Sequence, residues 1–240
     1  MEIFKLSGQK AVMNIIAIIP ARGNSKGIPN KNIIDFCGKP LLYWTINQSK
    51  MSKFIGDNVF VSSDSTEILN IAQEYNAHTI QRPLELATDT SSSEEALLHA
   101  LDDIEKKIEV DLVVFLQCTS PLRSPDDIDN AINHFIVNDY DSLFSATDVK
   151  DLCLWKNNEG KLESTNFNYR ERQRRQDREK QYSENGSFYI FKPKILKDNK
   201  NRFGGKIGFY EMDYWKIYEI DTEEDLNICD YYMKSKILRI

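Results

Sequence analysis

The chain has only four cysteines among its 240 residues, and none of them forms a C-x-x-C pair. They are Cys37, Cys118, Cys153 and Cys229. Because no two thiols are closely spaced, the sequence supports neither a zinc site nor a disulfide framework. We interpret each cysteine as a small buried apolar residue of a protein in a reducing compartment.

Long apolar runs and an excess of basic charge are also missing. No segment approaches the roughly 20 apolar residues that a membrane-spanning helix needs. Residues 11–20 faintly resemble a signal peptide, but the run is short, contains Asn14 and lacks a clean cleavage site. The net charge of −6 and the pI near 5.3 argue against a general nucleic-acid or membrane-surface binder. We expect a cytoplasmic protein with a dispensable leader at 1–13, and Met13 as an alternative start.

Two nucleotide-binding motifs and a hydrolase triad are absent as well. The sequence contains no G-x-x-x-x-G-K-[ST] and no G-x-G-x-x-G, so it supports neither a P-loop ATPase nor a Rossmann dehydrogenase. The three histidines, His78, His99 and His134, fall in or beside predicted helices, away from the polar motifs. We interpret them as structural, which leaves little support for Ser-His-Asp catalysis.

What the sequence does contain is an apolar strand, 15–20, followed at once by a loop rich in cations and amide donors. Glycines in this loop let the backbone approach an anion, while N–H groups, a hydroxyl and basic side chains supply donors and charge. The candidate phosphate ligands are Ala21, Arg22, Gly23, Asn24, Ser25, Lys26, Gly27 and Lys31. A solvated connection between a strand and a helix is the alternative interpretation.

Strand-like apolar runs alternate with helical periodicity along the chain. Strands are predicted at 15–20, 58–61 and 111–116, with a helix behind Pro40, a helix opened by a capping box at 91–94, and another capped by 124–127. This order predicts one α/β domain over 14–240, with a mostly parallel, Rossmann-like sheet and helices on both faces. Ligands in such folds bind outside the carboxyl ends of the strands, where every polar motif noted here lies.

Residues 148–186 interrupt the alternation. The stretch 166–180 is strongly polar, with five arginines between 170 and 178. Apolar residues occur beside it, at Leu152, Leu154, Trp155, Phe167 and Tyr169. We predict an inserted arm that makes the protein a homodimer by reaching the neighbouring subunit. The alternatives are a solvated charged loop and an RNA-binding arginine patch, the latter weakened by interspersed acidic residues.

Two distant segments carry longer motifs. The first is the loop, Ala21-Arg-Gly-Asn-Ser-Lys-Gly, with Lys31-Asn32; the second is Arg174-Arg-Gln-Asp177 followed by Tyr182-Ser-Glu-Asn-Gly-Ser-Phe-Tyr189. Both resemble the CMP-sialic acid synthetases, the acylneuraminate cytidylyltransferases. Further matches occur at 82–83, 89–93, 117–121, 205–207, 210–212 and 219–221. The resemblance covers roughly 14–235 and implies a fold of the nucleotide-diphospho-sugar transferase type.

The resemblance implies that the anomeric hydroxyl of a nonulosonic acid such as Neu5Ac or Kdn attacks the α-phosphorus of CTP. It implies catalytic roles for Arg22, Lys31 and Asp221, and it adds Asn32 and Arg82 to the CTP ligands. The implied sugar ligands are Gln117, Arg174, Arg175, Gln176, Tyr182 and Asn185. The alternatives are a legionaminate, pseudaminate, Kdo or other sugar nucleotidyltransferase and, from a different class, a non-enzymatic nucleotide-binding regulator.

A divalent cation, Mg²⁺ or Mn²⁺, also follows from the resemblance. Glu219 and Asp221 alternate on a predicted strand, so both carboxylates face one side and could share a hard cation. The family pattern there is D-x-D, so Glu219 is a departure and Asp221 is the stronger candidate. A solvated strand face ahead of the helix cap at 222–225 is the alternative. No side chain stands out as the general base.

Overall fold

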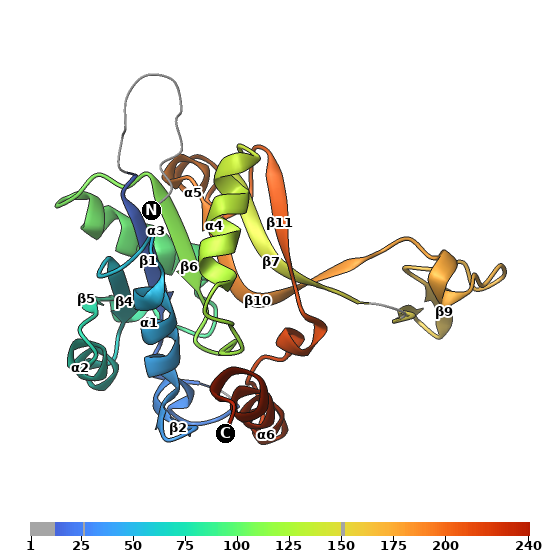
Figure 1. Ribbon diagram of the computed structural model, residues 1–240, viewed down its shortest axis with the longest axis horizontal. Coiled ribbons are helices and arrows are strands. Elements are labelled where there is room, and N and C mark those ends of the chain that lie inside the picture. The colour runs from blue at the N-terminus through green and yellow to red at the C-terminus, as the bar shows by residue number, and fades with distance from the viewer. Residues whose placement is uncertain (1–12, 26, 150–151) are drawn as a thin grey trace.

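The computed structural model describes residues 13–25, 27–149 and 152–240. Its centre is a seven-stranded sheet in the order β11-β7-β10-β6-β1-β4-β5 (Figure 1). The strands are β1 (Ile15–Pro20), β4 (Val59–Ser63), β5 (His78–Gln81), β6 (Leu112–Leu116), β7 (Ser142–Asp148), β10 (Tyr182–Phe191) and β11 (Ile207–Met212). β10 runs antiparallel to β6 and β7, and the other neighbouring pairs are parallel. The predicted mostly parallel α/β sheet is confirmed.

Helices cover both faces of this sheet. They are α1 (Leu41–Met51), α2 (Thr66–Glu74), α3 (Ser93–Glu105), α4 (Asp127–Val137), α5 (Pro193–Asn199) and α6 (Glu223–Tyr232). Buried side chains of α1, α2 and α4 belong to one apolar cluster, and those of α3 and α5 belong to a second cluster on the other face. The expected helices on both faces are therefore present.

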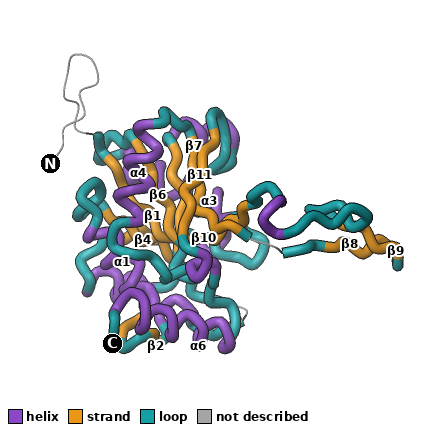
Figure 2. The backbone as a smooth tube through the Cα atoms, turned by 45° about the vertical axis from the view of Figure 1, so that its right-hand side comes forward, coloured by secondary structure: helices purple, strands orange, loops and turns teal. Residues whose placement is uncertain are grey.

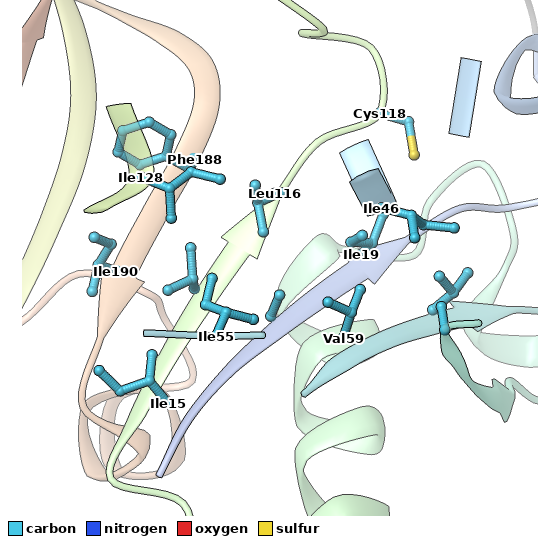
Figure 3. Packing of buried hydrophobic residues seen from close by; sticks show 14 of the residues in the cluster. Ile15, Ile19, Ile46, Ile55, Val59, Leu116, Cys118, Ile128, Phe188 and Ile190 are labelled. Atoms are coloured by element: carbon cyan, nitrogen blue, oxygen red, sulfur yellow. The ribbon is translucent and has the colours of Figure 1, made fainter. Parts of the chain in front are cut away.

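The apolar side chains of β1 explain why the sheet needs a layer of helices on each face. Ile15, Ala17 and Ile19 lie in the first cluster, whereas Ile16 and Ile18 lie in the second, because successive strand side chains point to opposite faces. All five are at most 2% exposed. Burying each isoleucine contributes about 1.5–3 kcal/mol, so a strand that is apolar at every position is stable only between two helical layers. Figure 3 shows side chains of the first cluster, including those of β1, β6 and β10.

Two predicted helix starts are shifted in the structure. The capping box of α3 begins at Ser92 and uses Glu95, one residue later than expected. α4 begins at Asp127, and its N-cap residue Asp126 makes no side-chain cap bond. Pro125, which was expected at the first position of this helix, therefore precedes it. The predicted cap at Thr222 is confirmed, since its side chain accepts a bond from the Asp225 N–H.

A third apolar cluster lies beyond the carboxyl ends of β1 and β6. It joins α1 and α6 to the loop that follows β6, through Phe36, Leu41, Leu122, Ile220, Cys229 and Met233. The Ile220 N–H donates to the Thr119 carbonyl oxygen at 2.7 Å, so residues 219–221 are anchored at the end of β6. A short antiparallel pair, β2 (Asp35–Phe36) and β3 (Lys39–Pro40), and the π-helical turn Met233–Leu238 complete this end of the molecule.

The segment between β7 and β10 projects from the body as an arm (Figures 1 and 2). It holds an antiparallel hairpin of β8 (Trp155–Asn158) and β9 (Lys161–Ser164) and a short 3₁₀ turn, Arg175–Asp177. An inserted arm was expected, but residues 182–186 belong to β10 of the central sheet. The arm therefore ends earlier than predicted.

Two further observations concern the cysteines and the membrane. Cys118 and Cys229 are buried as predicted, whereas Cys37 and Cys153 are only half-buried. The expectation of four buried thiols is therefore wrong for two of them. Within the described ranges, none of the helices has both the length and the apolar character needed to cross a bilayer.

Candidate active site

A cleft opens at the carboxyl ends of β1 and β6. Its walls come from the loop after β1, the start of α3, the end of β6 with the residues that follow it, and the segment before α6. The lining residues are Pro20, Arg22, Ser25, Gly27, Lys31, Asn32, Ser93, Phe115, Gln117, Cys118, Thr119 and Asp221. Residues of the predicted phosphate loop, 21–31, thus line the same cleft as the predicted sugar ligand Gln117 and the predicted metal ligand Asp221.

Arg22 is held in place by the segment before α3. Its Nη1 donates to the Asp89 carboxylate at 3.1 Å and to the Thr88 carbonyl oxygen at 3.2 Å. The guanidinium side chain is 34% exposed, so it retains a solvent-facing side. Arg22 is therefore oriented in advance and still accessible to an anion in the cleft.

The backbone of the loop is fixed from two sides. The Gly23 N–H donates to the Asp64 carboxylate at 3.0 Å, and the Asn32 side-chain amide donates to the Arg22 carbonyl oxygen at 2.9 Å. Asn32 is 7% exposed, so its amide N–H acts chiefly on the loop conformation. A Cβ on Gly23 would lie 3.0 Å from the Ser65 Cβ, which is a reason for glycine at this position.

The segment before α6 closes the loop from the other side. Lys31 Nζ lies 2.7 Å from Asp221 Oδ1, and the backbone of Asp221 is so close to Gly27 that a Cβ there would overlap its carbonyl oxygen. Lys31 is only 12% exposed in its side chain, whereas Asp221 is 71% exposed. The cation is therefore held against the loop, and the carboxylate faces the cleft.

Glu219 has a different environment. The segment 218–220 forms no strand, so the expectation of a strand there is wrong. Burial, and next the neighbouring Asp221, raise the pKa of the Glu219 carboxyl to about 7. Its carboxylate lies against Gly186, which has a φ of +64° and no room for a Cβ. A Cβ on Gly186 would also lie 3.0 Å from Gln117 Oε1. The side chains of Glu219 and Gln117 therefore both lie next to this glycine.

A divalent cation fits these donors in part. Among the described residues no group of three or more His, Cys, Asp or Glu side chains could hold a metal ion. Asp221 and Glu219 supply two carboxylates, and their proximity is expressed in the raised pKa of Glu219. Mg²⁺ commonly takes one or two carboxylates and completes its shell with phosphate oxygens and water. The donor set is therefore suited to a cation that arrives with a triphosphate.

The other predicted nucleotide ligands are less central. Arg82 is 5% exposed and follows the end of β5, where its Nη2 donates to the Ser62 carbonyl oxygen at 3.2 Å. Its Nε has no hydrogen-bond partner among the described residues, and burial lowers the pKa of the guanidinium. Ala21 is buried, Asn24 is exposed, and Lys26 lies outside the described residues.

The predicted sugar ligands separate into two groups. Gln117 lines the cleft. Asn185 is 1% exposed, and its amide donates to the Lys216 carbonyl oxygen at 3.2 Å, so it supports the backbone instead of facing the cleft. Tyr182 donates to the Glu211 carboxylate at 3.2 Å, outside the cleft lining.

The arm projects away from the central sheet (Figure 2), and none of the predicted arm ligands is among the residues that line the cleft. Arg174 Nε pairs with the Asp177 carboxylate at 2.8 Å, and its side chain is 77% exposed. Gln176 is also exposed. Arg175 lies in the 3₁₀ turn, but the described part of the structure does not include its side chain.

Several residues of the site escape the sequence reasoning. Ser93 and Phe115 line the cleft, and Arg123 is completely buried behind it. Arg202 Nε donates to the Glu94 carboxylate at 2.8 Å, and its guanidinium carbon lies 4.9 Å from the centre of the Phe115 ring. The only sequence signal for Arg123 is its place directly after the polar motif at 117–121 and Leu122. That place does not reveal what the guanidinium contacts.

The fold and the cleft together define an α/β protein with a cation-bearing loop in a cleft at the carboxyl edge of a mostly parallel sheet. The chain matches the family model described as Cytidylyltransferase over residues 16–239. It belongs to that family, and its relatives include the acylneuraminate enzymes whose motifs it resembles.

Three curated relatives are similar over most of this chain. "Post-translational flagellin modification protein B" of Campylobacter coli is 33% identical over 94% of this chain and 97% of its own length. "Pseudaminic acid cytidylyltransferase" of Campylobacter jejuni is 32% identical over 92% of this chain and 97% of its own length. "N-acylneuraminate cytidylyltransferase A" of Danio rerio is 35% identical over 89% of this chain, which spans only 49% of that relative.

Solved structures support the fold. A CMP:2-keto-3-deoxy-manno-octonic acid synthetase complexed with CTP superimposes with a TM-score of 0.70 at 15% identity, covering 93% of this chain and all of that one. A 4-diphosphocytidyl-2C-methyl-D-erythritol synthase gives a TM-score of 0.68 at 12% identity, covering 92% of this chain and 99% of the other. At such identities the likeness concerns the fold alone.

Proposed function

We propose that the chain transfers CMP from CTP to the anomeric hydroxyl of a nonulosonic acid, giving a CMP-sugar and pyrophosphate. The observation that carries this proposal is the 2.7 Å pair between Lys31 and Asp221, which joins the phosphate loop to the acidic segment in one cleft. In the reaction the anomeric oxygen forms a bond to the α-phosphorus. The bond from that phosphorus to the bridging oxygen breaks, pyrophosphate leaves with the electron pair, and the proton of the hydroxyl passes to water.

The loop after β1 is the proposed seat of the triphosphate. Catalysis of phosphoryl transfer depends mainly on positioning and on neutralising charge. Arg22 is already oriented by Asp89, so it stabilises developing phosphate charge at little cost in reorganisation. Lys31 adds a second cation, and Ser25 and the loop N–H groups donate to phosphate oxygens. Asn32 holds the loop through the Arg22 carbonyl, and Arg82 is assigned to the nucleotide.

We assign Mg²⁺ or Mn²⁺ to the carboxylates of Asp221 and Glu219. When bound, such a cation neutralises triphosphate charge and aligns the leaving group. Asp221 faces the cleft and is the main protein ligand in this assignment. Glu219 sits deeper, against Gly186, so its contribution is smaller.

The acid itself is proposed as Neu5Ac or Kdn, with pseudaminic acid as the second candidate. The second candidate is favoured by relatives described as pseudaminic acid cytidylyltransferases, which match this chain over 97% of their length at 32% identity. Gln117 is the proposed ligand for sugar hydroxyls on the β6 side of the cleft. Its side chain has both a donor and an acceptor, which suits a polyhydroxyl chain.

The arm is proposed to act in a homodimer. Leu154, Trp155 and Leu162 are 56%, 48% and 61% exposed, which is a high apolar exposure for a projecting hairpin. In this arrangement Arg174 or Arg175 reaches the partner's cleft and pairs with the acid's carboxylate, since a guanidinium binds a carboxylate through two parallel hydrogen bonds.

The test is a pyrophosphate-release assay with CTP, Mg²⁺ and a panel containing Neu5Ac, Kdn, pseudaminic acid, legionaminic acid and Kdo. Turnover of Neu5Ac or Kdn supports the first candidate. Turnover of pseudaminic acid alone selects the second, and turnover of Kdo alone overturns the nonulosonic substrates proposed here. CTP binding without turnover of any acid favours a nucleotide-binding regulator. Lys50→Ala, at an exposed ion pair away from the cleft, is the control variant and should match the wild type.

A further inference from the structure

Arg123 is a buried cation that makes no hydrogen bond or ion pair with a carboxylate among the described residues, although the charges of Asp127 and Glu219 act to raise its pKa. Its side chain is 0% exposed, and its donors all go to neutral oxygens. Nη2 reaches the carbonyl oxygens of Gln117 at 2.5 Å and Ser187 at 2.6 Å, and Nε reaches that of Ser187 at 3.2 Å. Nη1 reaches Gln48 Oε1 at 3.0 Å and Thr45 Oγ1 at 3.2 Å. One guanidinium thus joins α1, the end of β6 and β10.

Fold stability alone does not account for a charge at this position. Burial lowers the pKa of Arg123 to about 10, so the guanidinium is still charged at neutral pH and pays a desolvation cost. Apolar replacements of buried charges are often neutral or stabilising. Neighbouring positions in the same region, such as Leu122, are buried and apolar. The rigid, planar guanidinium donates several hydrogen bonds at once, which an apolar side chain cannot do.

These hydrogen bonds connect β6 and β10 at the point where their pairing ends. The antiparallel register ends with the pair Leu116 and Phe188, and the next backbone bond, from the Gln117 N–H to the Ser187 carbonyl oxygen, is long at 3.4 Å. At this point the two strands separate. Arg123 donates to the backbone carbonyl oxygens of Gln117 and Ser187. Its guanidinium therefore connects the two strands where the backbone hydrogen bonds between them weaken.

Gln117, at this junction, forms part of one wall of the cleft. The Gln117 side chain lines the cleft, and Gly186, next to Ser187, faces the Glu219 carboxylate. The phosphate loop lies on the opposite side, after β1, and has its own supports in Asp64 and Asn32. A change at the junction therefore moves Gln117 without altering these two supports of the phosphate loop.

We infer that Arg123 is a positioning residue that sets the Gln117 wall for the acid and leaves the binding of CTP to the loop. This inference rests on the proposed function. Arg123→Lys keeps a positive charge but cannot bridge both carbonyl groups, and Arg123→Met removes the donors. We expect the KM for the acid to rise about 10-fold in Arg123→Lys and more in Arg123→Met, since small misplacements at reacting centres have large kinetic effects. The Kd for CTP should stay within about two-fold, because the supports of the loop are unchanged.

The experiment measures kcat and KM for the acid that the wild type uses best, and the Kd for CTP with Mg²⁺ by calorimetry without acid. Ile132→Ala, in the core under α4, is the stability control, with an expected loss of about 2–5 kcal/mol. It should lower Tm without raising the KM for the acid. Thr45→Val, which removes one support of the guanidinium and keeps Arg123, replaces Arg123→Lys if the latter does not fold.

A double-mutant cycle separates positioning from general support of the fold. In a Gln117→Ala background, Arg123→Lys should change the KM for the acid by less than about two-fold, because the side chain through which it acts is gone. An equal effect in both backgrounds, an unchanged KM in Arg123→Lys, or a matching loss of CTP affinity overturns the inference. Absence of turnover by the wild type with every acid overturns the proposed function instead, so the two failures are distinguishable.

Discussion

Lys31 and Asp221 are 190 positions apart in the sequence, and Lys31 Nζ lies 2.7 Å from Asp221 Oδ1. The pair connects the phosphate loop, residues 21–31, to the segment before α6 at one side of the cleft. Its two members differ in exposure, at 12% for Lys31 and 71% for Asp221. The carboxylate is therefore available to a cation on the cleft side while the ammonium remains against the loop.

Asp221→Asn should abolish turnover and largely spare CTP binding. The substitution keeps the shape of the side chain but removes the charge proposed to hold the cation, so kcat should fall on the order of 10²-fold or more. Glu219→Ala should have a smaller effect, because its carboxylate is deeper and lies against Gly186. Pyrophosphate release gives kcat, and calorimetry with CTP and Mg²⁺ gives the Kd. Full activity in Asp221→Asn would remove Asp221 from the metal site.

Arg22→Ala should cost roughly 2–4 kcal/mol of transition-state stabilisation, because it removes a preorganised cation from developing phosphate charge. The measurement is kcat/KM, with circular dichroism to establish that the fold is intact. Lys50→Ala serves as the matched control, since it also removes a cation with an acidic partner but lies away from the cleft lining. An unchanged kcat/KM in Arg22→Ala contradicts the assignment of the loop to the triphosphate.

The parts of the site that are local in sequence are the parts that the sequence predicts. The loop after β1 is recognisable because glycine, serine and basic residues follow a buried strand within ten positions. The alternation of strands and helices likewise predicts the sheet, since the side chains of β1 must be buried on both faces.

Other features depend on distant partners and escape such reasoning. The role of Arg123 is invisible until Gln117 and Ser187 are brought together by pairing of β6 with β10. The orientation of Asn185 also could not be predicted, because a register shift in the pairing of β10 with β7, between Glu184 and Tyr189, breaks the alternation on which a sequence-based assignment relies. A polar side chain in a motif predicts importance, but its direction is decided by strand register.

Gly186→Ala should reduce both stability and activity. A side chain at this φ of +64° is strained, and its Cβ would overlap the Glu219 carboxylate. We expect the free energy of unfolding to fall by about 1–3 kcal/mol and kcat/KM for the acid to fall with it, because Glu219 and Gln117 are displaced. Urea unfolding and steady-state kinetics measure the two effects.

Gly56→Ala is the control for this substitution. Gly56 also has a positive φ, +56°, but no atom of the described residues lies within 4 Å of the position that a Cβ would take. It should lose stability and keep kcat/KM. If both variants keep full activity, the contact of Gly186 with the cleft wall has no role in the reaction.

Glu219 should make the metal-free protein less stable as the pH rises. Burial and then Asp221 raise the pKa of its carboxyl from 4.5 to about 7. The folded state therefore holds the proton more tightly than the unfolded state, and the free energy of unfolding falls as pH rises through this window. In EDTA, Glu219→Gln should gain Tm relative to the wild type at about pH 8 and gain less at about pH 5. Glu224→Gln, at an exposed residue of α6, is the control; a gain independent of pH argues against the raised pKa.

Replacing apolar residues of the arm should convert a dimer into a monomer. Trp155 and Leu162 are exposed on the β8–β9 hairpin, and an interface with an apolar centre and a polar rim would bury them. The double variant Trp155→Ser with Leu162→Ser should halve the mass measured by light scattering at micromolar concentration. Lys161→Ala, in the same hairpin, should leave the mass unchanged. A wild-type monomer with full activity refutes the role of the arm.

Subunit exchange tests whether the arm also completes the partner's site. Arg175→Ala and Asp221→Asn are both expected to be inactive alone. In a mixed dimer, the body of the Arg175→Ala subunit keeps Asp221 and receives an intact arm from its partner, so one of the two sites is whole. Random exchange makes half of the dimers mixed, and the mixture should therefore regain about a quarter of the wild-type activity. If the mixture stays inactive although exchange is shown by light scattering of tagged subunits, Arg175 acts in its own chain or not at all, and the arm serves dimerisation alone.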